Sequence, residues 1–239
     1  MPLSFSISSI RGTVFMPRIP YEGGIVNNLL QRFQGYIPCF YGSPVVDNGI
    51  VFNPGDWELK AADGSVRVVF MNQKIDYIEL GVKEYSQETI SAFASRCSSL
   101  FSGILETRGQ LSSRLAIAPS FICQQPFSET KGILSSIYSD SKLHFDDSEV
   151  DNCEFSQVFR PVKQIAGADV KLNFLAKFST ETEISVNNGV ASQLQRMKAD
   201  FDVNTMPING ITFSIAAVQD FFNKAANFCD DFYQFYFQD

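Results

Sequence analysis

The chain has 239 residues, of which 45% are apolar, and it carries a formal net charge of −7 at pH 7 with 19 basic residues. These basic residues are scattered singly, and because phosphate neutralisation needs clustered Lys and Arg, the pattern argues against a nucleic-acid surface and a polybasic membrane patch. No window approaches 18 consecutive apolar residues, so the sequence excludes a helix that crosses a bilayer.

Hydrophobic periodicity divides the first half of the chain into a strand, a helix, a three-strand meander and a second helix. Residues 3–16 alternate apolar side chains with serines, and residues 25–33 carry apolar side chains at helical spacing. Turn-forming residues separate three expected strands within 50–82. The second helix has a single apolar stripe, with Ser86 as its expected N-cap and Gly109 at its expected end.

The second half gives a similar series of elements. We expect strands at 112–125, 155–164, 170–178 and 192–205, a short helix near 128–138 and a long final helix. The order of elements predicts an antiparallel α+β fold, in which curved sheets pack against long amphipathic helices within one domain. A duplication would make residues 1–124 and 125–239 two similar halves that share a core.

The sequence contains none of the common catalytic or cofactor motifs. It has no complete glycine-rich phosphate loop, no G-x-S-x-G and no H-E-x-x-H. His144 is the only histidine, which excludes sites that need two imidazoles. We therefore expect no cofactor. The five cysteines are widely spaced without a C-x-x-C pair, which predicts free thiols and a cytoplasmic location.

An acidic loop surrounds the single histidine. Its candidate metal ligands are Asp146, Asp147, Glu149 and Asp151, and a His144–Cys153 dyad is a second possibility. An EF-hand loop needs a central glycine, and this run has none. Runs of like charge are usually solvated, so the favoured interpretation is an exposed connector between the halves.

A second group of oxygen-bearing side chains is Asp200, Asp202 and Asn204, spaced two residues apart. Such a group could serve a metal-dependent hydrolase or nuclease if a further carboxylate converged on it. The intervening residues, and Met197 before them, are apolar, as a half-buried strand requires. The favoured interpretation is therefore the solvent face of a strand.

The final helix carries two neighbouring apolar lines. One steps from Ile215 to Tyr236 in intervals of three and four residues, and the second contains Phe221, Phe228 and Phe235. Both lines could lie on the sheet, or one could meet a second subunit or a partner, where aromatic residues are enriched. The candidate interface residues are Phe221, Phe228, Phe235 and Tyr236.

Three segments resemble a sporadically distributed bacterial family of uncharacterised proteins of similar length. They are "GDWELKAADGSVRVVFMNQKIDYIELG", the second helix with "LSSRLAIAP" after it, and "KADFDVNT…FFNKAANFCDDFYQFYF". The resemblance covers most of the chain and rests on a pattern of elements, so it implies no site residues. The patchy distribution of the family implies mobile or antiviral-defence loci.

The sequence as a whole favours a non-enzymatic cytoplasmic protein that works through protein contacts, as a homo-oligomer or with a partner held by the final helix. Two alternatives stay open. One is the hydrolase or nuclease that uses Asp200 and Asp202, and the other is a small-ligand pocket between the sheet and the Phe-rich helices.

Overall fold

The structure is a computed structural model of the whole chain. It describes residues 4–21, 23–41, 45–47, 50–52, 55–130, 144–145, 148–149, 154–187, 190–207 and 211–237.

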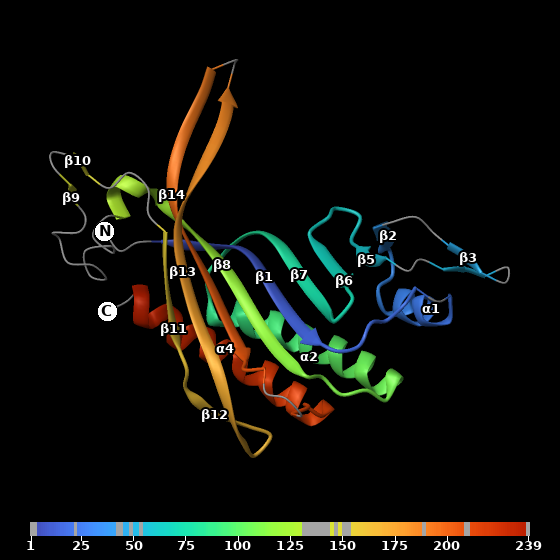
Figure 1. Cartoon of the computed structure of the whole chain (residues 1–239). Coiled ribbons are helices and arrows are strands. Elements are labelled where there is room, and N and C mark those ends of the chain that lie inside the picture. Colours follow the sequence, from blue (N-terminus) through green and yellow to red (C-terminus); the bar gives the residue numbers. More distant parts are fainter. Residues whose placement is uncertain are drawn as a thin grey trace.

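Ten antiparallel strands form one open sheet (Figure 1). Their order is β11-β13-β14-β8-β1-β7-β6-β5-β2, and β12 also pairs with β13. The strands are β1 (Phe5–Phe15), β2 (Ile37–Tyr41), β5 (Asp56–Lys60), β6 (Val66–Phe70), β7 (Lys74–Glu84), β8 (Arg114–Pro126), β11 (Glu154–Phe159), β12 (Val162–Ile165), β13 (Ala168–Asn187) and β14 (Val190–Thr205). Two short hairpins stand apart from this sheet: β3 (Val45–Asp47) with β4 (Ile50–Phe52), and β9 (His144–Phe145) with β10 (Ser148–Glu149).

Two long helices cover one face of the sheet and leave the other face uncovered by helices in the described part of the chain (Figure 1). These are α2 (Gln87–Arg108) and α4 (Ile215–Phe237), and the shorter α1 (Gly23–Arg32) lies near β2. The arrangement confirms the predicted α+β class. The hydroxyl of Ser86 accepts a hydrogen bond from the Thr89 amide, and Gly109 ends α2 in the left-handed conformation with φ 59°, so both predicted caps are confirmed.

Aromatic side chains contribute many of the contacts in the core. Phe201 on β14 packs against Phe232 of α4 with a ring-centroid distance of 4.8 Å. Phe101 of α2 meets Phe222 of α4 at 5.4 Å. These contacts join the two helices to each other and α4 to the sheet, so α4 is enclosed on two sides.

The strand order repeats on the two sides of the central β1–β8 pair. One side runs β1-β7-β6-β5 and the other runs β8-β14-β13-β11, with α2 following β7 and α4 following β14. The expected boundary between residues 124 and 125 falls inside β8, which is the first strand of the second set. The start of β8 at Arg114 would divide the two sets of elements without cutting a strand.

Gly12 of β1 lies directly against the helix layer. A Cβ atom at this position would overlap the Cys97 Sγ atom of α2 and approach Phe222 of α4. We expect Gly12→Ala to lower the free energy of unfolding in urea by about 1–3 kcal/mol, because overpacking strains a dense core.

Removing the Cys97 sulfur gives the matched control. In the double variant Gly12→Ala/Cys97→Ala, the new methyl group takes the place of Sγ, so the double variant should lose less stability than the sum of the two single losses. Additive losses would show that the close contact with Sγ is not the reason for glycine here.

Candidate functional site

β14 has one buried apolar face and one polar face. Met197, Ala199, Phe201 and Val203 are all almost fully buried on the helix side. Asp200, Asp202 and Asn204 therefore project from the opposite, uncovered face of the sheet. The predicted alternation is confirmed.

Asp200 is held by its neighbours on the sheet. Its Oδ1 atom accepts a hydrogen bond from the hydroxyl of Ser120 on β8, and its Oδ2 lies 3.5 Å from the Nζ of Lys198, two residues earlier on the same strand. The carboxylate thus already has a hydroxyl donor and a cation.

The same arrangement occurs at Asp76 in the first set of strands. Thr13 on β1 donates to Asp76 Oδ1 at 2.6 Å, and Lys74, two residues before the aspartate, lies 2.8 Å from Oδ2. The sequence signal is a repeated Lys-x-Asp in "KID" and "KAD". Sequence reasoning missed it because the hydroxyl partners lie 63 and 80 residues away.

Asn204 projects from this face but is not exposed to solvent, contrary to the sequence-based interpretation, since its exposed fraction is only 3%. Arg114 Nη2 donates to Asn204 Oδ1 at 2.7 Å, and Asn173 Nδ2 donates to the same oxygen at 3.2 Å. Asn204 in turn donates to Asp202 Oδ1 at 2.9 Å. Side chains from the neighbouring strands β8 and β13 therefore close over this residue.

A groove of about 440 Å³ crosses the uncovered face beside these residues. Its charged lining consists of Arg11, Lys177, Lys198, Asp200 and Asp202. Charges of both signs are interleaved there, so the groove has no single electrostatic character. Within the described residues, no group of three or more His, Cys, Asp and Glu side chains lies close enough to hold a metal ion.

Most of the acidic-loop candidates fall outside the described residues, namely Asp146, Asp147, Asp151 and Cys153. The backbone of Glu149 is described, and it pairs with His144 in the β9–β10 hairpin.

The chain itself covers two of the four interface candidates on α4. Phe221 is fully buried, and Phe228 is nearly so and packs against Phe174 of β13 at a centroid distance of 5.9 Å. Tyr236 is half-buried, and Phe235 keeps 57% of its surface exposed. Of the four candidates, only Phe235 and the exposed part of Tyr236 are accessible to a partner that binds α4.

Phe235 borders an apolar groove between the end of α4 and the β11–β12 edge, which we call the edge groove. It has a volume of about 310 Å³ and is lined by Phe159, Pro161, Lys163, Phe174, Asp231, Phe232 and Phe235. The Phe159 ring lies 5.8 Å from Phe235 and is itself 40% exposed. Val158 and Val162 are also exposed on this edge but do not line the groove, and Val158 lies on the opposite face of β11 from Phe159. Exposed apolar side chains that gather around a groove are typical of a binding surface.

Tyr236 ties α4 to this edge. Its hydroxyl donates to Gln157 Oε1 on β11 at 2.6 Å, and burial raises its pKa to about 12. The contact fixes the end of α4 beside β11.

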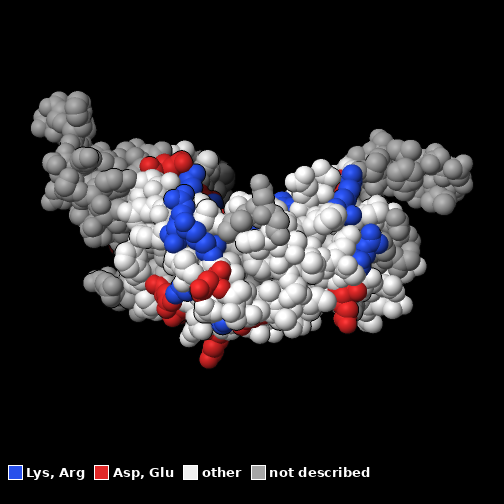
Figure 2. Space-filling view, turned by 60° about the horizontal axis from the view of Figure 1, so that its bottom comes forward, with Lys and Arg blue, Asp and Glu red and all other residues white. Residues whose placement is uncertain are grey.

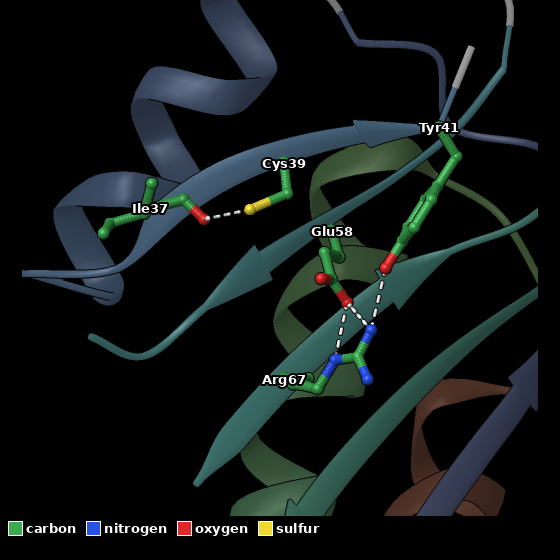
Figure 3. A network of polar contacts seen from close by, with 5 residues as sticks. All are labelled: Ile37, Cys39, Tyr41, Glu58 and Arg67. Carbon is green, nitrogen blue, oxygen red and sulfur yellow. Dashed lines mark hydrogen bonds and ion pairs between the residues drawn. The ribbon is translucent and has the colours of Figure 1, made fainter. Parts of the chain in front are cut away.

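The opposite edge of the sheet is organised by a polar network (Figure 3). Arg67 on β6 donates from Nε to Glu58 Oε2 at 2.7 Å and from Nη2 to the hydroxyl of Tyr41 at 2.8 Å. Hydrogen bonding to Glu58 raises the pKa of Arg67. Pro38 within β2 also lacks a backbone N–H donor. This edge is therefore less suited to extension by a further strand than β11.

In Figure 2 most of the charged side chains in view lie towards the two ends of the molecule, and much of the surface between them is uncharged. The outward positions of α2 include Ser91, Ser95 and Ser99, which are exposed, polar and uncharged.

None of the described helices is long and apolar enough to cross a membrane.

The chain matches no protein-family model, and no curated protein matches it significantly. The resemblance to a bacterial family stays a prediction.

Asp76 and Asp200 should differ in their contribution to stability. The side chain of Asp76 is 2% exposed and that of Asp200 is 39% exposed. We expect Asp76→Asn to lower the free energy of unfolding by about 1–3 kcal/mol, because a buried charged hydrogen bond is weakened, and Asp200→Asn to cost less. Urea denaturation of both variants provides the measurement, and the reverse order would contradict the structural role.

Tyr236 predicts a pH dependence of stability. Its pKa in the folded protein lies above the ordinary value of 10.0, so its contribution is complete below pH 10 and is lost as the pH rises towards about 12. The free energy of unfolding should therefore fall over this range, and less steeply in Tyr236→Phe. If the free energy of unfolding falls equally steeply with pH in Tyr236→Phe, Tyr236 has the same pKa in the folded and the unfolded chain, which would contradict the prediction.

Proposed function

We propose that the chain is a non-enzymatic module that acts through protein contacts, and that it binds a polypeptide strand along β11 with apolar side chains seated in the edge groove. The edge groove carries the proposal, because exposed Phe235 and Phe159 flank it beside the last strand of the sheet. An edge strand offers backbone groups to an added strand, and a neighbouring apolar groove supplies specificity.

The pairing of β11 supports this mode of binding. Of the described strands, only β13 pairs with β11, through Glu154–Phe159. Positions 156–160 are exposed. β11 contains no proline, so each of its residues has a backbone N–H group. The ladder with β13 holds β11 in an extended form before binding. This preorganisation lowers the conformational-entropy cost of adding a further strand.

The uncovered face of the sheet supports binding over catalysis. The carboxylates of the alternative hydrolase site interact with Ser120, Lys198 and Asn204 inside the sheet. We therefore do not propose that activity.

The state of the cysteines fits a cytoplasmic module. Cys39, Cys97, Cys123 and Cys229 are free thiols, and burial raises the pKa of Cys97 and Cys229, which disfavours their reactive thiolate forms. Free thiols persist in reducing compartments. A role in an antiviral-defence locus rests on the family resemblance alone.

Site-specific photo-crosslinking tests the proposal. A benzoylphenylalanine at position 235 places the reactive ketone at the mouth of the edge groove, and the same residue at position 111 serves as control, since Leu111 is also about half exposed. After irradiation of the protein, alone and in a lysate of its source organism, we expect a polypeptide adduct at 235 that is reduced by Val158→Asp.

Position 111 should give no adduct that depends on Val158. Equal adducts at 235 and 111, or none at 235 under either condition, would count against the edge groove as a binding site.

A further inference from the structure

We infer that the strand bound along β11 is β11 of a second copy of this chain, paired antiparallel about a two-fold axis at Gln157. The inference rests on the proposed function and names its partner. In this register Gln157 faces its own counterpart, Val158 faces Ser156, Phe159 faces Phe155 and Arg160 faces Glu154. The two sheets then continue into one another through their β11 edges.

Charge complementarity selects this register. Glu154 lies at one end of β11 and Arg160 directly follows the other end. Their separation of six residues places both on the same face of the strand, which is the uncovered face where Glu154 meets Lys177 of β13. Antiparallel self-pairing at Gln157 brings each Glu154 opposite an Arg160, so two ion pairs close the ends of the joint. Opposite charges at facing positions stabilise a pair of strands.

The helix side of the joint carries an aromatic side chain two residues to either side of Gln157, which itself bonds Tyr236 on this side. Phe155 stacks on Phe178 of β13 at a centroid distance of 4.7 Å, and Phe159 lies against Phe232 and Phe235 of α4. Self-pairing places Phe159 of one copy opposite Phe155 of the other, beside the edge groove. The exposed surfaces of Phe159 and Phe235 are then buried at the centre of a contact whose rim is charged, as in other protein interfaces.

The geometry also limits the assembly to two copies. A two-fold contact uses the same surface on both partners, and so the contact closes on itself once formed. The β2 edge, with its Arg67–Glu58–Tyr41 network, stays outside the joint. Inside the chain, β1 and β8 already join the two sets of strands in an antiparallel pair. The dimer would repeat that kind of joint between copies.

Charge exchange across the joint provides the test. Sedimentation equilibrium of the wild-type chain should give a dimer, and Arg160→Glu or Glu154→Arg should each raise its dissociation constant about tenfold or more, because each places like charges opposite one another twice. The double variant Glu154→Arg/Arg160→Glu restores opposite charges and should return the constant to within a few-fold of the wild-type value.

Two controls separate the joint from general effects. Lys60→Glu reverses an exposed charge on β5, on the far side of the sheet, and should leave the dissociation constant unchanged. Glu154→Arg also loses the ion pair with Lys177, so circular dichroism and thermal unfolding should show that each variant keeps its fold. The Arg160→Glu variant keeps this ion pair and carries the comparison if Glu154→Arg is destabilised.

The outcomes distinguish the inference from the proposed function. A wild-type chain that stays monomeric at its highest soluble concentration, while the cross-linker at 235 captures a different polypeptide, overturns the second copy and leaves the edge groove as a protein-binding site. A dimer that is indifferent to charge reversal at 154 and 160 overturns the register and with it the inference. A monomer with no adduct at 235 overturns both.

Discussion

The enclosure of α4 between the sheet and α2 is the constraint on which the rest of the structure depends. Phe222 of α4 meets Phe101 of α2, while Phe232 meets Phe201 on the sheet. An aromatic helix of this kind needs apolar cover on more than one side, and the sheet alone covers only one. Gly12 allows the close approach, because any side chain there would overlap Cys97 of α2.

Because both long helices pack on the same face of the sheet, the two faces differ in composition. The helix side takes the aromatic core, and the uncovered side keeps the polar pairs around Asp76 and Asp200. Each aspartate interacts with a hydroxyl from the neighbouring strand and with a lysine two residues earlier. Each carboxylate thus neutralises the lysine on its own strand and accepts a hydrogen bond from the neighbouring strand, and the repetition of this pair on both sides of the β1–β8 pair indicates a structural role.

The enclosure also leaves one side of the last turns of α4 exposed. Phe228 packs against Phe174 of β13, but Phe235 borders the edge groove and keeps 57% of its surface exposed. The apolar surface that remains is therefore at the β11 edge, where Tyr236 holds the helix end to Gln157. A contact with another protein at this edge would bury the apolar surface that the chain itself leaves exposed.

The sequence by itself determined the α+β class, the alternation on β14 and both caps of α2, because each depends on residues that are close in the chain. It also identified the aromatic final helix. Only the tertiary structure decided which of its phenylalanines stay exposed, since the sheet margin is set by strand order and not by helical spacing. The burial of Asn204 likewise depends on Arg114 and Asn173, from strands 90 and 31 residues away. Contacts at such separations leave no local pattern in a single sequence, and for this reason the edge groove emerged only from the fold.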